Sequence, residues 1–190
     1  MSYKTASYRL TGIAPLLMHN GQLANPIGYY AKELKKVSGK RVKTDADFER
    51  MAEIEFKGGL YLTEEHGPVI PGDMIEAMLT EAAKKQRKGQ QVKAGVIVDG
   101  AFPLEYDGPR DADKLWQNER YRLVKGVKIQ KNRVMRTRPR FLEWKLEAKI
   151  DYMASVINKT EIDDMMVLAG EQVGLGDWRP RYGRFLVEAL

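Results

Sequence analysis

Residues 143–152 have the sequence EWKLEAKIDY, the most regular strand pattern in the chain. Charged residues there alternate strictly with apolar ones, which are Trp144, Leu146, Ala148, Ile150 and Tyr152. Because successive side chains of a strand point to opposite faces, this period of two predicts a strand with one buried face. The rest of the sequence has to supply the apolar layer that covers this face.

Five other segments have the patterns of partners for that strand. Strand patterns cover residues 3–12, 92–98 and 184–188, and apolar residues keep helical spacing over 73–88 and 161–173. In chain order the six elements give βαββαβ, the order of a ferredoxin-like or RNA-recognition-motif-like sandwich. The sequence therefore predicts an α+β fold with this core.

Two long segments separate the core elements. Residues 13–70 precede the first core helix, and residues 99–142 lie between the two central strands. We expect both to be insertions in a single domain over residues 1–190, because a chain of this length forms one core. Insertions of this size commonly carry function.

The positive charge is concentrated in the second insertion. The chain has 32 Lys and Arg against 26 Asp and Glu, a net charge of +6, yet the stretch from Arg120 to Leu142 contains no acidic residue. Its basic residues exceed the whole net charge, so the rest of the chain is net negative. They are Arg120, Arg122, Lys125, Lys128, Lys131, Arg133, Arg136, Arg138 and Arg140. Such a concentration favours a polyanionic partner.

The basic stretch predicts a β-hairpin. Two strand-like arms, residues 121–129 and 133–141, flank a polar turn. Alternate residues of a strand share a face at a spacing of roughly 6–7 Å, so Arg136, Arg138 and Arg140 would form a row suited to an extended single strand. The alternative is a solvated edge hairpin that uses charge against aggregation. We favour nucleic acid because edge protection does not need so many cations without an acid.

A Gly-rich loop near the end of the chain is the second candidate site. Residues 174–185 have the sequence GLGDWRPRYGRF. Glycine lets a backbone approach phosphate, aromatic rings stack on bases, and arginine does either. The alternative is a helix cap at Gly174 and a turn at Gly183, with Trp178 in the core. The candidate binding residues here are Trp178, Arg179, Arg181, Tyr182 and Arg184.

Residues for enzymatic chemistry are scarce. The chain has no cysteine, and His19 and His66 are its only histidines. No phosphate-binding GxxxxGK[ST], GxSxG or HExxH motif is present. We therefore expect no cofactor and no metal site. His19, which precedes Asn20-Gly21, is the candidate acid or base if the protein is a metal-independent ribonuclease.

Three short segments resemble the RAMP superfamily of CRISPR effector proteins. They are the opening strand with Pro15-Leu16 after it, the turn Val69-Ile70-Pro71-Gly72, and the Gly-rich loop ending Tyr182-Gly183-Arg184-Phe185. The resemblance implies a ferredoxin-like core whose first helix opens at an Ile-Pro-Gly turn, and a Gly-rich loop that helps to hold RNA. Backbone subunits of this superfamily also carry a hairpin thumb and polymerise along guide RNA, and the basic hairpin is similar in position.

The whole chain also resembles small proteins of bacteriophages and prophages, which makes single-stranded DNA the alternative ligand. We expect a non-enzymatic protein of the bacterial cytoplasm that binds single-stranded RNA or DNA without sequence specificity, as a homo-oligomer or filament along the strand. No apolar run is long enough for a membrane span, and no secretory signal opens the chain. Two alternatives stay open: a metal-independent endoribonuclease, and a phage structural or regulatory protein that binds another protein, such as a CRISPR complex.

Overall fold

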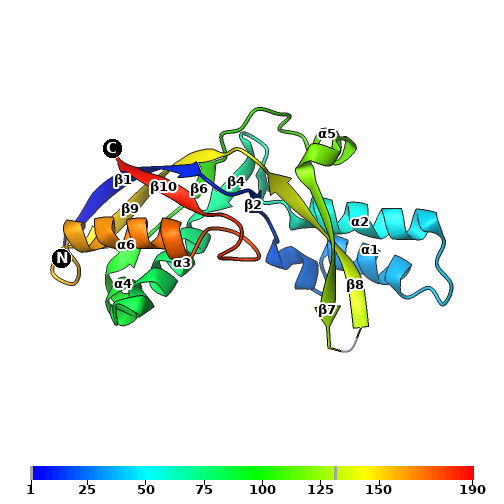
Figure 1. The fold of residues 1–190 in the computed structure, drawn as a ribbon, viewed down its shortest axis with the longest axis horizontal. Helices are drawn as coiled ribbons and strands as arrows, with labels where there is room; N and C mark the ends of the chain where they lie inside the picture. Colours follow the sequence, from blue (N-terminus) through cyan, green and yellow to red (C-terminus); the bar gives the residue numbers. More distant parts are fainter. Residues whose placement is uncertain (1, 131) are drawn as a thin grey trace. The chain divides into compact units, whose positions relative to one another are not determined.

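The computed structural model describes residues 2–130 and 132–190, which form two compact units (Figure 1). The first unit contains the chain up to Leu16, then Leu62–Asp107 and Leu142–Leu190. The second unit contains Leu17–Tyr61 and Gly108–Phe141. The expectation of a single domain with insertions at 13–70 and 99–142 stays a prediction.

The first unit holds a four-stranded antiparallel sheet. Its strands, in spatial order, are β10 (Phe185–Ala189), β1 (Tyr3–Gly12), β9 (Lys145–Met153) and β5 (Val96–Ile97). Strand β9 lies between β1 and β5, the two strands that precede and follow helix α3 (Gly72–Lys85) in the core order. Strand β1 lies between β9 and β10, the two strands that precede and follow helix α6 (Lys159–Gln172). These two split βαβ units make a ferredoxin-like core, so the predicted α+β fold class is confirmed.

Helices α3 (Gly72–Lys85) and α6 (Lys159–Gln172) pack on each other beside this sheet (Figure 1). On β9 the residues Leu146, Ala148 and Ile150 are buried, whereas the charged residues between them are exposed. Their partners across the ladder on β1 are the buried Leu10, Tyr8 and Ala6. The apolar residues of β9 therefore form part of the core, because they share one face of the sheet with their partners on β1 and this face packs against the helices.

The predicted strand over residues 92–98 is wrong for most of its length. Residues Gly89–Gly95 form helix α4, and only Val96–Ile97 forms β5. The buried residues Val92, Gly95 and Val96 are three and four positions apart, which is the spacing of a helix face. A short apolar run with β-branched residues fits either structure, and packing of α4 against α3 decides for the helix.

A smaller sheet completes the first unit. Its strands, in spatial order, are β3 (Leu62–Thr63), β4 (Gly67–Pro71) and β6 (Ala101–Pro103). Strand β4 leads directly into α3 through the Ile-Pro-Gly turn that the sequence analysis singled out. None of the helices in the described residues is long and apolar enough to cross a membrane.

The second unit is built around the predicted hairpin. Strands β7 (Arg122–Ile129) and β8 (Asn132–Phe141) pair in antiparallel register from Arg122↔Pro139 to Ile129↔Asn132, which confirms the hairpin. Lys131 lies outside the described residues. The other elements are β2 (Leu16–Leu17), where the chain enters the unit, η1 (Gly21–Ala24), α1 (Tyr29–Ser38), α2 (Asp45–Gly59), α5 (Ala112–Gln117) and η2 (Glu119–Tyr121).

Helix α2 packs against β8 and α5 within the second unit. It begins with a capping box between Thr44 and Asp47, and the ring of Phe56 lies 5.5 Å from that of Trp116 in α5. At the end of α2, a Cβ on Gly59 would lie 3.1 Å from the Cδ of Pro139 in β8. The absence of a side chain at Gly59 therefore lets helix and hairpin approach closely.

The turn into α3 supplies a stability prediction. The N–H of Gly72 donates to the carbonyl of Gly100 at 2.8 Å, and a Cβ on Gly72 would lie 1.9 Å from the carbonyl oxygen of Val98. Gly72→Ala is expected to lower the free energy of unfolding by about 2–3 kcal/mol, because backbone has to move to accept the methyl group. Chemical denaturation measures this loss. Gly21→Ala, where nothing lies within 4 Å of the new Cβ, is the control; an equal loss in both variants would contradict the account.

Candidate nucleic-acid interface

The register of the hairpin divides its cations between two faces. Residues directly opposite each other in an antiparallel pair share a face. Arg136 lies opposite Lys125, and Arg138 lies opposite Leu123. Arg133 lies opposite Lys128, and this pair points to the other face of the hairpin, because Arg133 is an odd number of positions from Arg136. The basic residues therefore do not form one continuous strip.

The row expected from the sequence, Arg136, Arg138 and Arg140, is bonded within the second unit. The Nη1 of Arg136 donates to the Oε1 of Glu55 at 2.8 Å, and that carboxylate is only 6% exposed. Arg138 is 7% exposed, and its Nη1 donates to the carbonyl of Thr137. The Nε and Nη2 of Arg140 donate to the carbonyl of Arg120 at 3.2 and 3.0 Å. Arg136 therefore holds the hairpin to α2, and Arg140 holds it to η2.

Glu55 is a residue that the sequence analysis missed. Its second oxygen, Oε2, accepts the backbone N–H of Thr137 at 2.8 Å, so the carboxylate holds both a side chain and the edge of β8. In the sequence, Glu55 follows Met51 by four positions and Ala52 by three, which places it on the apolar face of α2. A carboxylate at such a position indicates a buried partner, because a buried charge is costly unless it is paired.

The opposite face of the hairpin is open to solvent toward the turn. Val124 is 53% exposed and Met135 is 60% exposed, and Lys128 and Arg133 are exposed beside them. Gly126 lies opposite Met135 and contributes no side chain. We call the residues Val124, Gly126, Lys128, Arg133 and Met135 the outer face. It combines an apolar centre with two cations, an arrangement that can contact bases and phosphates together.

Two further basic residues lie near the base of the hairpin. The guanidinium carbon of Arg122 lies 4.4 Å from the centre of a Trp116 ring, and its Nη2 lies 3.4 Å from Glu119. Arg122 is therefore engaged with an aromatic ring and a carboxylate. Arg120, by contrast, has an exposed side chain and uses only its backbone carbonyl to hold Arg140.

The glycines of the Gly-rich loop have structural roles. Gly174, Gly176 and Gly183 have φ values of +78°, +80° and +73°, which favour glycine. A Cβ on Gly183 would lie 1.7 Å from the carbonyl oxygen of Leu175, whose N–H bonds to the Gly183 carbonyl at 2.8 Å. A backbone hydrogen bond therefore closes the loop between Leu175 and Gly183, which agrees with the alternative of a helix cap at Gly174 and a turn at Gly183.

The aromatic and basic side chains of the loop are accessible. Trp178 is partly exposed rather than in the core, and its ring centre lies 6.2 Å from that of Tyr182. Arg179, Arg181 and Arg184 are exposed. All five candidate residues of the loop are therefore at least partly exposed, and their role in binding stays a prediction.

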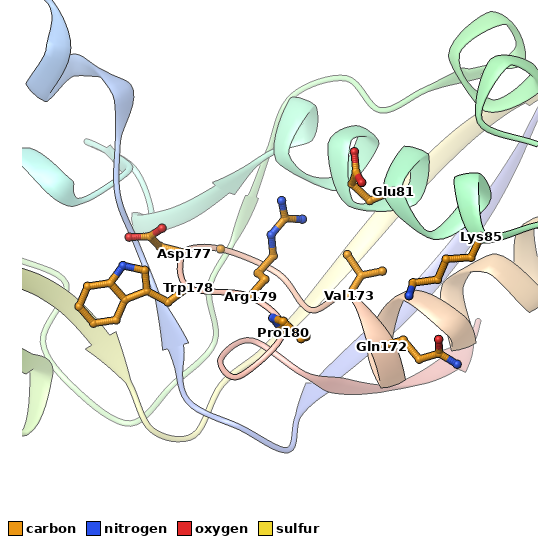
Figure 2. Close-up of a pocket in the computed structure, with 9 residues that line it drawn as sticks. Glu81, Lys85, Gln172, Val173, Asp177, Trp178, Arg179 and Pro180 are labelled. Carbon is orange, nitrogen blue, oxygen red and sulfur yellow. The ribbon is translucent and has the colours of Figure 1, made fainter. Parts of the chain in front are cut away.

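A cavity of about 500 Å³ lies beside this loop (Figure 2). Glu81 and Lys85 of α3 line it on one side, and Trp178, Arg179 and Pro180 line it from the loop. Arg179 extends toward Glu81 in Figure 2, and hydrogen bonding from Lys84 lowers the pKa of Glu81, with a smaller contribution from the charge of Arg179. The volume is that of a site for a small organic ligand. Its mixed charges and its indole ring suit a nucleotide better than phosphate alone.

The two histidines lie in different surroundings. His19 is exposed and lines a smaller cavity of the second unit together with Arg136 and Arg138. Its backbone carbonyl accepts a hydrogen bond from the Tyr61 hydroxyl at 3.3 Å. His66 is exposed, in the turn before β4, with its Nε2 3.6 Å from Glu65. Among the described residues, no cluster of three or more His, Asp or Glu side chains has the geometry to hold a metal ion.

Comparison with known proteins shows a likeness in fold. No protein-family model matches the chain, and no curated protein matches it. A solved structure described as "Cryo-EM structure of the Type III-B Cmr-beta bound to cognate target RNA" contains a chain that matches with a TM-score of 0.53 at 12% sequence identity. The match covers 99% of the present chain and 61% of the other, so the chain spans about three fifths of that neighbour's length. The fold of the present chain is thus similar to that of a chain in this Type III-B Cmr-beta structure.

The two hydrogen bonds to the Glu55 carboxylate predict a loss of stability when its charge is removed. Glu55→Gln is expected to lower the free energy of unfolding by about 2–4 kcal/mol, because Arg136 and the Thr137 N–H lose a charged acceptor in a buried place. Denaturant unfolding measures the loss. The control is Glu119→Gln, which removes an exposed carboxylate beside Arg122 and should cost less than about 0.5 kcal/mol. Equal losses in the two variants would show that the Glu55 contacts do not hold the hairpin.

Proposed function

We propose that this protein binds single-stranded nucleic acid, with RNA as the favoured ligand, and that it does so without sequence specificity and without catalysis. The outer face of the hairpin is the observation that carries the proposal, since it exposes cations and apolar side chains together. The likeness in fold to a chain from a complex bound to target RNA supports RNA over DNA.

In this proposal the phosphate contacts come from the exposed part of the basic segment. Lys128 and Arg133 on the outer face, together with Arg120, contact the backbone of the strand. Lys125, which is exposed on the other face of the hairpin, and Lys131 belong to the same basic stretch and are part of the proposal. Arg122, Arg136, Arg138 and Arg140 contribute mainly through the positive potential of the unit, because contacts within the protein hold their guanidinium groups.

The Gly-rich loop supplies the base contacts. Trp178 and Tyr182 offer aromatic faces on which unpaired bases stack, and stacking tolerates any sequence because every base has such a face. Arg179, Arg181 and Arg184 then contact phosphates on either side of the stacked base. Assembly of several copies along one strand is part of the proposal and would appear as cooperative binding to longer oligonucleotides.

The salt dependence of binding tests the outer face. Affinity for single-stranded RNA, single-stranded DNA and duplex is measured by fluorescence anisotropy at several salt concentrations, and recovered RNA is checked for cleavage. In the double variant Lys128→Ala/Arg133→Ala, the slope of log K against log salt should fall by about 1.4, at roughly 0.7 for each lost phosphate contact.

The matched control for this double variant is Lys145→Ala/Lys149→Ala, which removes two exposed cations from one face of β9. Its slope should stay close to that of the wild type. Equal slopes in the two double variants would reject the outer face as the binding surface. Intact RNA is the expected result for the recovered strand.

Stacking is tested by truncating the indole. Trp178→Ala should weaken binding by about tenfold and leave the salt slope unchanged, since a stacked base contributes about 1–3 kcal/mol without releasing counterions. Trp178→Phe keeps an aromatic face and should retain most of the affinity. If the two variants bind alike, the ring does not stack on a base.

The two other functions give different results in the same assays. One observation favours cleavage of RNA, namely that His19 lines a cavity together with two arginines. If the protein cleaves RNA and the His19→Ala variant does not, the protein is an endoribonuclease. Failure of the protein to bind any of the three oligonucleotides would favour a partner protein, such as a CRISPR complex, as the ligand of the hairpin.

A further inference from the structure

The cavity of about 500 Å³ beside the Gly-rich loop has two ends of different chemistry. Figure 2 shows Asp177 and Trp178 at one end and Lys85 of α3 at the other, with Arg179 and Glu81 between them. All of its lining belongs to the first unit. We call this space the loop cavity. An aromatic ring thus stands at one end of it and a cation at the other.

Cations from three elements gather at the loop cavity. Lys85 of α3 and Arg179 of the loop line it together with Glu81. Hydrogen bonding from Lys84 lowers the pKa of Glu81. The charges of Arg179 and Lys93 lower it further, so both of these cations lie near the same carboxylate. Lys93 belongs to the last turn of α4, which packs against α3.

The charge at this place is net positive. Among the described residues, the cations at the cavity outnumber the two carboxylates of its lining. The cations are Lys84, Lys85, Lys93 and Arg179, all exposed, and the carboxylates are those of Glu81 and Asp177. Cations at the ends of α3 and α4 favour the helix dipoles, but the dipoles do not require Arg179 of the loop at the same place. A concentration of positive charge at a cavity attracts an anion.

The indole at the other end stands on an unfavourable backbone position. Trp178 has a φ of +53°, in the left-handed region that favours glycine. Its side chain is partly exposed and lines the cavity. Residues in such conformations gather at binding sites, where the contact with the ligand is the reason to keep the side chain. The position of Trp178 therefore indicates a ligand with an aromatic or planar group.

The two ends match the two parts of a nucleotide. A planar base stacks on an indole ring, and a phosphate pairs with ammonium and guanidinium groups. The volume of about 500 Å³ lies within the range of about 300–1,000 Å³ that is usual for sites of small organic ligands. Inorganic phosphate alone does not use the indole, and a nucleoside without phosphate does not use the cations.

We propose that the loop cavity binds one nucleotide, with its base against Trp178 and its phosphate between Lys85 and Arg179. Lys84 and Lys93 add to the attraction for the phosphate. The nucleotide is either free in solution or one unit of a bound strand. The second source rests on the proposed function and adds the ends of α3 and α4 to the binding surface, whereas binding of a free nucleotide does not rest on it.

The first experiment uses adenosine 5′-monophosphate, adenosine and inorganic phosphate as probes. The midpoint of thermal unfolding of the full chain is followed against the concentration of each probe at constant ionic strength. A ligand that binds only the folded protein raises the midpoint with its concentration. The monophosphate uses both ends of the cavity, so it should raise the midpoint at concentrations at which adenosine and phosphate have little effect.

Three variants show whether the loop cavity is responsible. Trp178→Gly removes the indole at a position where the backbone favours glycine, and should weaken binding of the monophosphate by about tenfold. Lys85→Ala changes an exposed residue, so the fold should be kept, and binding should weaken by a few fold. Lys149→Ala removes an exposed cation of β9 and should respond as the wild type does.

The second experiment tests the strand as the source of the nucleotide. In Lys85→Ala/Lys93→Ala, the salt slope for single-stranded RNA should fall by about 1.4, at roughly 0.7 for each lost phosphate contact. Lys145→Ala/Lys149→Ala is again the control. Equal slopes in these two double variants, while Lys128→Ala/Arg133→Ala still lowers the slope, would exclude a strand in the cavity and leave the proposed function standing.

The two experiments together separate this proposal from the proposed function. If no oligonucleotide binds while adenosine 5′-monophosphate still stabilises the wild type more than Trp178→Gly, the proposed function fails and the nucleotide site stands. Equal responses to the monophosphate in the wild type and all three variants, together with equal salt slopes in Lys85→Ala/Lys93→Ala and its control, would overturn the nucleotide site.

Discussion

The carboxylate of Glu55 decides which part of the basic hairpin faces solvent. One oxygen binds the guanidinium of Arg136 and the other binds the backbone N–H of Thr137, so helix α2 is fixed to the edge of β8 by a buried charge. A strand shows alternate residues to opposite sides. On the side that does not carry Arg136, Thr137 and Pro139 are buried near the base of the hairpin, and the residues toward the turn are exposed. The outer face, with Lys128 and Arg133 beside Val124 and Met135, is this exposed part.

The sheet and helices of the first unit carry the Gly-rich loop. Its ferredoxin-like sheet pairs β1 with β9 from Tyr3↔Met153 to Thr11↔Lys145, and α3 and α6 cover the apolar face. The loop that follows α6 is held closed by backbone hydrogen bonds and by glycines with positive φ, so its side chains are carried on a defined turn. In the proposed complex, Trp178 and Tyr182 would contact a base without the loop first having to become ordered, which lowers the entropic cost of binding.

Secondary-structure elements with a long, regular apolar pattern could be predicted from the sequence. Features that depend on contacts between residues far apart in the chain could not. Ten residues of strict alternation were enough to predict β9, and two strand-like arms around a polar turn were enough to predict the hairpin. The run 92–98 was too short to separate a strand from a helix, and packing against α3 decided it. Periodicity also showed that Arg136, Arg138 and Arg140 share a face, but it does not say which face is covered. That depends on Glu55, which is 81 positions from Arg136 in the chain.

The central claim is that the exposed face of the hairpin and the Gly-rich loop contact a single strand of RNA. Photocrosslinking of RNA that contains 4-thiouridine, followed by mass spectrometry of the crosslinked peptides, tests it most directly. The account predicts crosslinks within β7 and β8 around Val124 and Met135, and within the loop at Trp178 or Tyr182. Crosslinks confined to the exposed face of the β1–β9 sheet would contradict it.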